Sequence, residues 1–232
     1  MPWDFWLLFL VLAVLIPWRG RVRLRHLLEE PSFGSKEKLV LYGSTIVFQW
    51  LLLGLVLWRA LVRGVTVAEM GLGRPWDASL VVWSVIGGAA VGAFQWFNLR
   101  RAGRMSGAVP DLMRKLSERL LPQKPVELPP YAALAITAGI CEEFVYRGFV
   151  MAVLLRAGLA AWAVVIVSSL LFGVAHAYQG RNGITGTALM GLVFGIGRLL
   201  TGSLAPVMMW HATLDVVAGV AGPRFLRARD DA

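Results

Sequence analysis

The sequence predicts an all-α protein, a polytopic transmembrane bundle of about seven helical spans with one amphipathic helix at the membrane interface. Hydrophobic residues make up 57% of the chain and charged residues only 16%, whereas soluble domains are about 25% charged. Several apolar runs reach the roughly 20 residues that a helix needs to cross a bilayer. These runs are apolar on all sides, so we expect them to face lipid or one another.

The predicted spans follow one another along the whole chain. They cover residues 3–18, 39–58, 79–99, 131–155, 159–178, 184–200 and 205–221. The first run has no basic stretch before it and no small-residue cleavage site after it, so we expect a retained helix rather than a cleaved signal peptide. The sole cysteine, Cys141, excludes an intramolecular disulfide and a thiolate zinc site.

Basic residues are concentrated in two predicted loops and the C-terminal tail. They are Arg19, Arg21, Arg23, Arg25, Lys36 and Lys38, then Arg100, Arg101, Arg104, Arg114, Lys115, Arg119 and Lys124, and finally Arg224, Arg227 and Arg229. With seven spans these segments share one side, which the positive-inside rule makes cytoplasmic, so we expect the N-terminus outside and the C-terminus inside. The net charge of +9 is therefore attributed to membrane lipid contacts, and no nucleic-acid partner is expected.

A proline-rich stretch divides the chain. Residues 111–121 space leucines against basic residues, which predicts an amphipathic surface helix, and Pro122, Pro125, Pro129 and Pro130 break the chain after it. We therefore expect an N-terminal three-span region with basic loops at residues 1–130, a catalytic core at 131–222 and a cytoplasmic tail of basic and acidic residues at 223–232.

The apolar core contains five ionisable candidates for a site. Between residues 131 and 222 the only acidic residues are Glu142, Glu143 and Asp215, and the only histidines are His176 and His211. A charged group at bilayer depth costs at least roughly 2.5–3.5 kcal/mol on insertion scales. Separate structural pairs would explain any one of these residues, but five on three predicted helices favour a shared site.

Helical spacing gives the two glutamates different roles. Glu143 lies one turn before Arg147, in the favourable order for an ion pair, which predicts a structural role. Glu142 has Tyr146 one turn later and no cation one turn away on its own face of the helix. It is therefore the candidate for a general base.

The histidines belong to two further helical pairs. Phe172 and His176 share one helix face, and His211 and Asp215 share another. His176 could simply bond a backbone carbonyl, whereas Asp215 can fix the tautomer of His211 or favour its protonated form.

Two kinds of chemistry fit these residues. Glu142 and a neutral His176 can hold and deprotonate a water, with His211 stabilising an oxyanion. Alternatively, Glu142, His176 and His211 could bind zinc with a water in the fourth position. Both arrangements hydrolyse an acyl bond, and no serine or cysteine lies in a nucleophile motif.

Three motifs resemble those of a known family. E-E-F-V-Y-R at residues 142–147, F-G-V-A-H at 172–176 and H-A-T-L-D at 211–215 resemble the EExxxR, FxxxH and HxxxN/D motifs of the CPBP intramembrane endopeptidases. That family includes type II CAAX prenyl proteases and bacterial Abi and bacteriocin-processing proteins. The resemblance covers about residues 131–222; the first three spans resemble the family only in being hydrophobic.

The resemblance implies a glutamate-dependent peptidase acting on a membrane-associated protein or peptide. Glu142 would activate the water, His176 would position it, and His211 with Asp215 would face the oxyanion. Prenyl proteases of the family carry asparagine at the position of Asp215, and bacterial members often carry aspartate. Because an ionised carboxylate repels an oxyanion, Asp215 either acts protonated or charges His211, and we favour the second.

Several alternatives remain at this stage. No cofactor is expected, although a divalent metal such as zinc fits the motifs as well. A non-catalytic bacteriocin-immunity or membrane scaffold protein of the Abi type would use the same helices for binding. A proton-coupled transporter fits less well, because the chain lacks a paired repeat with broken helices. We expect the protein in a bacterial plasma membrane.

The predicted spans place the candidate site residues at different depths in the membrane. Glu142 and Asp215 fall near mid-membrane, while His176 falls near the cytoplasmic end of its predicted helix. Tilted helices or an extended fifth span, with a cavity open to the cytoplasm, would bring them together.

Overall fold

The structure, a computed structural model, describes residues 1–30, 33–104 and 111–226 of the chain, and in these ranges the regular elements are all helical. The elements are α1 (Trp3–Leu10), the π-helix η1 (Val11–Leu15), α2 (Ile16–Glu29), α3 (Ser35–Val62), α4 (Ala78–Arg104), α5 (Asp111–Leu120), the 3₁₀ turn η2 (Pro125–Glu127), α6 (Leu128–Glu143), the π-helix η3 (Phe144–Val150), α7 (Met151–Arg156), α8 (Ala161–Ala175), the 3₁₀ turn η4 (Ala177–Gln179), α9 (Gly180–Thr201) and α10 (Ala205–Phe225). The predicted all-α membrane bundle is confirmed.

In the described part of the chain, four helices are long and apolar enough to cross a membrane. They are Trp3–Glu29, Ser35–Val62, Ala78–Arg104 and Ala177–Thr201. The other three predicted spans correspond to the continuous α6–η3–α7 segment, to α8 and to α10. The total of seven spans therefore stays a prediction. The tail predicted at 223–232 begins inside α10, and residues 227–232 lie outside the described part.

The prediction of a loop containing Arg19, Arg21, Arg23 and Arg25 is wrong, because all four lie on α2. Two of these arginines face α3. The Arg19 guanidinium lies 3.8 Å from the centroid of the Phe48 ring. Arg23 donates hydrogen bonds to α3, to the Thr45 hydroxyl and the Leu41 carbonyl among others. These contacts let the helix continue to Glu29 beyond the end of the apolar run.

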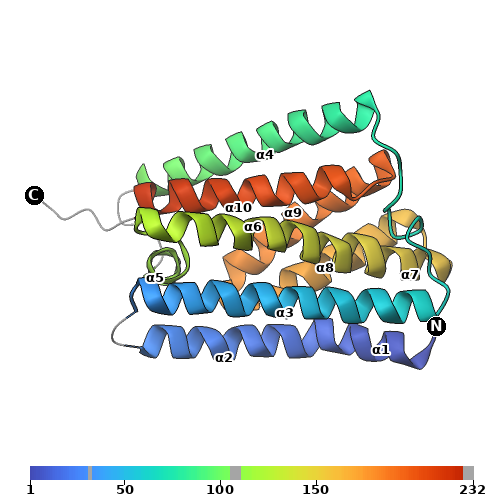
Figure 1. Ribbon diagram of the computed structural model, residues 1–232, viewed down its shortest axis with the longest axis horizontal. Helices are drawn as coiled ribbons and strands as arrows, with labels where there is room; N and C mark the ends of the chain where they lie inside the picture. The colour runs from blue at the N-terminus through green and yellow to red at the C-terminus, as the bar shows by residue number, and fades with distance from the viewer. Residues whose placement is uncertain (31–32, 105–110, 227–232) are drawn as a thin grey trace, which may run out of the picture.

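The two ends of the bundle differ in character. The ends of α2, α4 and α10, the starts of α3 and α6, and α5 lie at one end of the molecule, which carries most of the basic residues (Figure 1). At the opposite end, Trp3, Trp58, Trp76 and Trp162 are each at least 58% exposed. Because tryptophan prefers the boundary between hydrocarbon and water, these side chains indicate where one membrane interface meets the bundle.

The amphipathic segment before the core is a helix, as predicted. α5 is joined to the start of α3 through its C-terminal residues: the Tyr42 hydroxyl donates to the Leu120 carbonyl at 2.9 Å, and Lys38 Nζ donates to the Leu121 carbonyl at 2.7 Å. Lys38 also lies 3.4 Å from the buried carboxylate of Glu127. Its position on the membrane surface stays a prediction.

Two glycines allow the core helices to touch through their backbones. A Cβ atom added at Gly139 of α6 would lie 2.7 Å from the Met208 carbonyl oxygen of α10. A Cβ added at Gly173 of α8 would lie 2.8 Å from the Ile184 carbonyl oxygen of α9. These close approaches set α6 against α10 and α8 against α9, which determines where the polar residues of the four helices meet.

The fifth predicted span, 159–178, is shorter than expected. α8 has 15 residues and ends at Ala175, so it is about 22 Å long and does not reach across a hydrocarbon layer of about 30 Å. His176 follows immediately, and η4 leads into Gly180, whose φ of +79° suits glycine. Of the two arrangements expected to bring His176 to the other residues, the extended fifth span does not occur: α8 ends at Ala175, and His176 just after it lies near Glu142.

Candidate active site

The polar residues of the core lie on both sides of an unusual stretch of helix. The α6 helix ends at Glu143, and the following seven residues, Phe144–Val150, form a π-helix in which every residue is buried. A π-helix has more residues per turn than an α-helix and often occurs at functional sites. Sequence spacing that assumes 3.6 residues per turn could not predict this change, which alters the directions of Tyr146 and Arg147 relative to the glutamates.

Glu143 is the centre of a fully buried group. Its Oε1 lies 3.0 Å from Nη1 of Arg147 and 2.8 Å from Nδ1 of His211. Glu143 and Arg147 have no exposed surface, and His211 is 5% exposed. The ion pair with Arg147 is the one expected from the helical spacing. The contact with His211 links α6 to α10 and has no counterpart in the sequence patterns.

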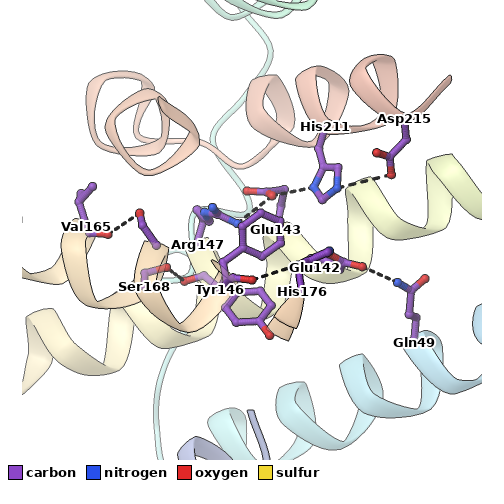
Figure 2. Close-up of polar contacts among 12 residues, drawn as sticks. Gln49, Glu142, Glu143, Tyr146, Arg147, Val165, Ser168, His176, His211 and Asp215 are labelled. Atoms are coloured by element: carbon purple, nitrogen blue, oxygen red, sulfur yellow. Dashed lines mark hydrogen bonds and ion pairs between the residues drawn. The ribbon is translucent and has the colours of Figure 1, made fainter. Parts of the chain in front are cut away.

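Glu142 points to a different side of the helix (Figure 2). Its Oε1 accepts a hydrogen bond of 2.7 Å from Nε2 of Gln49 on α3, a residue that the sequence analysis did not single out. Its Oε2 has no hydrogen-bond partner in the described part of the chain and lies 3.8 Å from Nε2 of His176. The two atoms are therefore close enough for one water molecule to bridge them.

The ring of His176 has a defined tautomer. Its Nδ1 lies 2.9 Å from the carbonyl oxygen of Phe172. Because a carbonyl oxygen only accepts, Nδ1 must carry a hydrogen and donate it. In a neutral ring Nε2 then has a free lone pair, and this is the atom that faces Glu142. The simple structural explanation for His176, a bond to a backbone carbonyl, thus holds for one ring nitrogen and leaves the other available.

His211 lies between two carboxylates (Figure 2). Its Nδ1 contacts Glu143, and its Nε2 lies 3.6 Å from Oδ2 of Asp215. The hydroxyl of Tyr131 donates to the backbone carbonyl of Asp215 at 3.0 Å. With hydrogens on both ring nitrogens, His211 can donate to Glu143 and also toward the side occupied by Asp215.

Aromatic rings separate and support the two histidines. The Phe172 ring centroid lies 4.8 Å from that of His176 and 5.7 Å from that of His211. The Arg147 guanidinium lies 4.2 Å from the Phe172 centroid, an attractive cation–π arrangement. Tyr146 packs edge-on against Phe172, with ring centroids 5.2 Å apart. Phe172 therefore fixes the ring positions, while Tyr146 contributes packing.

The side chains form a buried layer and a partly exposed layer. Glu143 and Arg147 have fully buried side chains, and that of His211 is only 7% exposed. In contrast, the side chains of Glu142, His176 and Asp215 are 22%, 17% and 29% exposed. The second layer therefore lies at the border of the packed core, and the first layer, which is buried behind it, holds its side chains in place.

The expected zinc alternative requires Glu142, His176 and His211 to converge on one ion. In residues 1–30, 33–104 and 111–226, no group of three or more histidine, cysteine or acidic side chains is arranged to hold a metal. His211 uses Nδ1 for Glu143 and directs Nε2 toward Asp215. The residues as placed do not fit a zinc centre, so no reaction step is assigned to a metal.

Comparison with known proteins identifies the core. A family model described as type II CAAX prenyl endopeptidase Rce1-like matches residues 124–217. Neither the curated proteins nor the solved structures gave a match. The matched segment contains all three motifs, from Glu142 to Asp215, and excludes α1 to α4. Residues 124–217 of this chain are therefore similar to the type II CAAX prenyl endopeptidase Rce1-like family.

Proposed function

We propose that this protein is a glutamate-dependent intramembrane endopeptidase that hydrolyses a peptide bond in a membrane-associated protein or peptide. The observation that carries the proposal is the pair formed by Glu142 Oε2 and His176 Nε2, 3.8 Å apart. Each of these atoms presents a lone pair to the other, and neither can donate in the ionised carboxylate and the neutral ring. A water molecule is the partner that satisfies both.

This water is the nucleophile in the proposed reaction. Placed about 2.8 Å from both atoms, it donates one hydrogen to each, and its own lone pairs point away from the protein toward a substrate carbonyl. Glu142 takes a proton as the oxygen attacks the carbonyl carbon. The proton then passes to the amide nitrogen as the C–N bond breaks, leaving a carboxylic acid and an amine. The acid then gives its remaining proton to the amine, which yields a carboxylate and an ammonium.

His211 is the proposed oxyanion partner. A tetrahedral intermediate has a negatively charged oxygen, which is stabilised by donors already aimed at it. Glu143 fixes Nδ1 of His211, so Nε2 is the ring atom available to donate. Asp215, 3.6 Å from Nε2, favours the charged ring and is not itself an oxyanion donor. This assignment keeps an ionised carboxylate from facing the oxyanion directly.

The proposed substrate approaches from the basic end of the bundle, which we place in the cytoplasm of a bacterial cell. Positive side chains are enriched on cytoplasmic segments, and the exposed tryptophans mark the opposite interface. The protein would be embedded in the lipid bilayer, and its substrate would be associated with the same bilayer. The family that residues 124–217 resemble is named for prenylated substrates, so a prenylated C-terminal peptide is the first to test.

The test compares wild type with Glu142→Gln in lipid vesicles. The probe is a quenched fluorogenic peptide ending in a farnesylated cysteine and three further residues, alongside the same peptide without the farnesyl group. We expect cleavage by wild type and a loss of about 10²–10⁴-fold in Glu142→Gln. Glu118→Gln is the matched control, because Glu118 lies on the exposed face of α5, and it should cleave like wild type.

Two further results would change the assignment. Cleavage that stops with a zinc chelator and returns with added zinc would replace the metal-free reaction with the metal-dependent one. Wild type that binds the peptides but cleaves neither them nor any membrane protein from a bacterial extract would favour the immunity or scaffold function of the Abi type.

A further inference from the structure

Gln49 is out of place in its own helix. Between Thr45 and Arg59 the sequence of α3 reads IVFQWLLLGLVLW, and Gln49 is its only residue with an amide, hydroxyl or charged side chain. Placing an amide in hydrocarbon is unfavourable unless it forms hydrogen bonds. A lone polar residue in such a run therefore requires an explanation from its contacts.

The contact of Gln49 is with the proposed base. Its Nε2 lies 2.7 Å from Oε1 of Glu142, across the interface between α3 and α6 (Figure 2). An ionised carboxylate only accepts hydrogen bonds, so the amide must present its NH₂ group to it. The amide oxygen of Gln49 is buried and has no partner among the described residues. The side chain thus leaves its own acceptor unsatisfied while its donor engages Glu142.

The bond makes the two oxygens of Glu142 unequal. Oε1 is held by Gln49, and Oε2 is left to face His176. Without the amide, the carboxylate could rotate about its last bond and exchange the two oxygens. With it, the oxygen that receives the proton of the water has one position relative to His176.

We propose that Gln49 is a positioning residue of the active site, which orients Glu142 to take the proton of the attacking water. This inference rests on the proposed function, since it assigns Gln49 to the same water-activating carboxylate. It also gives the N-terminal helices a part in the reaction, because Gln49 lies outside the segment 124–217 that matches the family.

The kinetic test uses two substitutions with opposite effects on the bond. Gln49→Met keeps the length of the side chain and removes the donor, and we expect kcat to fall about 10–100-fold with little change in KM. Gln49→Glu places a second carboxylate beside that of Glu142, and the two repel each other when both are ionised. At acid pH they share a proton, and the shared proton restores the bond, so kcat should approach the wild-type value there and fall as pH rises.

The matched control is Gln95→Met. Gln95 lies on α4, which α6 and α10 separate from α3 (Figure 1), and this variant should keep wild-type kcat and pH profile. A Gln49→Met protein with wild-type kcat would overturn the proposal. So would a Gln49→Glu protein whose rate follows the wild-type pH profile, because a residue that only joins two helices would alter stability without altering that profile.

A second readout does not depend on turnover. The infrared band of the Glu142 carboxylate can be isolated by subtracting the spectrum of Glu142→Gln. Losing a hydrogen bond to one oxygen should shift this band in Gln49→Met and leave it unchanged in Gln95→Met. If the band does not move, the positioning role fails. If it moves while wild type cleaves no substrate, the contact is established and the proposed function is what fails.

Discussion

Oε1 of Glu143 lies 2.8 Å from Nδ1 of His211, so the second glutamate of the pair connects α6 to α10. Spacing along the helix assigned this residue to Arg147 alone. In the structure one oxygen serves both partners, and the bond to His211 selects which ring nitrogen can face a substrate. Glu143 therefore supports the site as well as the fold, although it is fully buried and cannot touch the reacting atoms.

Substitutions of the two glutamates should have different effects, one on cleavage and the other on stability. Glu142→Gln keeps the acceptor oxygen and the shape of the side chain, so we expect lost cleavage with an unfolding temperature close to wild type. Glu143→Gln leaves the Arg147 charge buried without its partner, which typically costs about 3–5 kcal/mol. Thermal unfolding of both variants in the same detergent measures the difference. Equal unfolding temperatures would contradict the assignment of Glu143 to the buried layer.

Asp215→Asn tests how Asp215 acts. This change removes one of the two carboxylates that face His211 and keeps the size of the side chain. If Asp215 serves by charging His211, the alkaline limb of the kcat profile should move to lower pH, because the ring loses its proton more easily. The measurement is kcat from pH 5 to 9. Full activity with an unchanged profile would leave Asp215 without this role.

The close contact between α6 and α10 at Gly139 should be essential for stability. In Gly139→Ala the new methyl group would lie 2.7 Å from the Met208 carbonyl oxygen, so the helices must separate, with an expected loss of about 1–3 kcal/mol. Gly54→Ala is the control: no atom lies within 4 Å of the corresponding position, and alanine there should stabilise α3 by about 0.5–1 kcal/mol. Thermal unfolding distinguishes these two outcomes, and equal behaviour would refute the close contact.

Glu127 should make stability depend on pH at the basic end. Burial alone would raise the pKa of Glu127, but hydrogen bonds from the Ser35 hydroxyl and the Gln123 amide, with Lys38 3.4 Å away, lower the pKa overall. A lowered folded-state pKa means that the stabilisation is complete above the unfolded value of about 4.3 and is lost as pH falls below it.

Comparison with Glu127→Gln checks this pH dependence. The wild type should unfold at a higher temperature at pH 7, and the difference should shrink as pH falls below about 4.3. Thermal unfolding across this range gives the answer. A difference that stays constant with pH would show that the ionised carboxylate is not what stabilises the fold there.

The sequence predicted what depends on neighbours along one helix. Glu143 with Arg147, Phe172 with His176 and His211 with Asp215 are each four residues apart, and each pair is in contact in the structure. The apolar runs predicted the bundle for the same reason, because hydrophobicity is a property of each segment.

What the sequence missed depends on how helices meet. The bonds of Gln49 to Glu142 and of His211 to Glu143 join residues 93 and 68 positions apart, and no local pattern encodes them. The lone amide in α3 was the available signal for the first. The π-helix after Glu143 and the early end of α8 were also missed, because no proline in Phe144–Val150 or in residues 176–178 marks either change of helix.

The early end of α8 bears on where the products of a cleavage would go. Counted from the interface that the exposed tryptophans indicate, a helix of about 22 Å in a layer of about 30 Å would end about 8 Å short of the basic surface. Hydrolysis creates a new ammonium and a new carboxylate, each costing at least roughly 2.5–3.5 kcal/mol at bilayer depth. Both new chain ends would therefore leave toward the basic end of the bundle. Release in this one direction would keep the fragments from readily returning to the site to be rejoined.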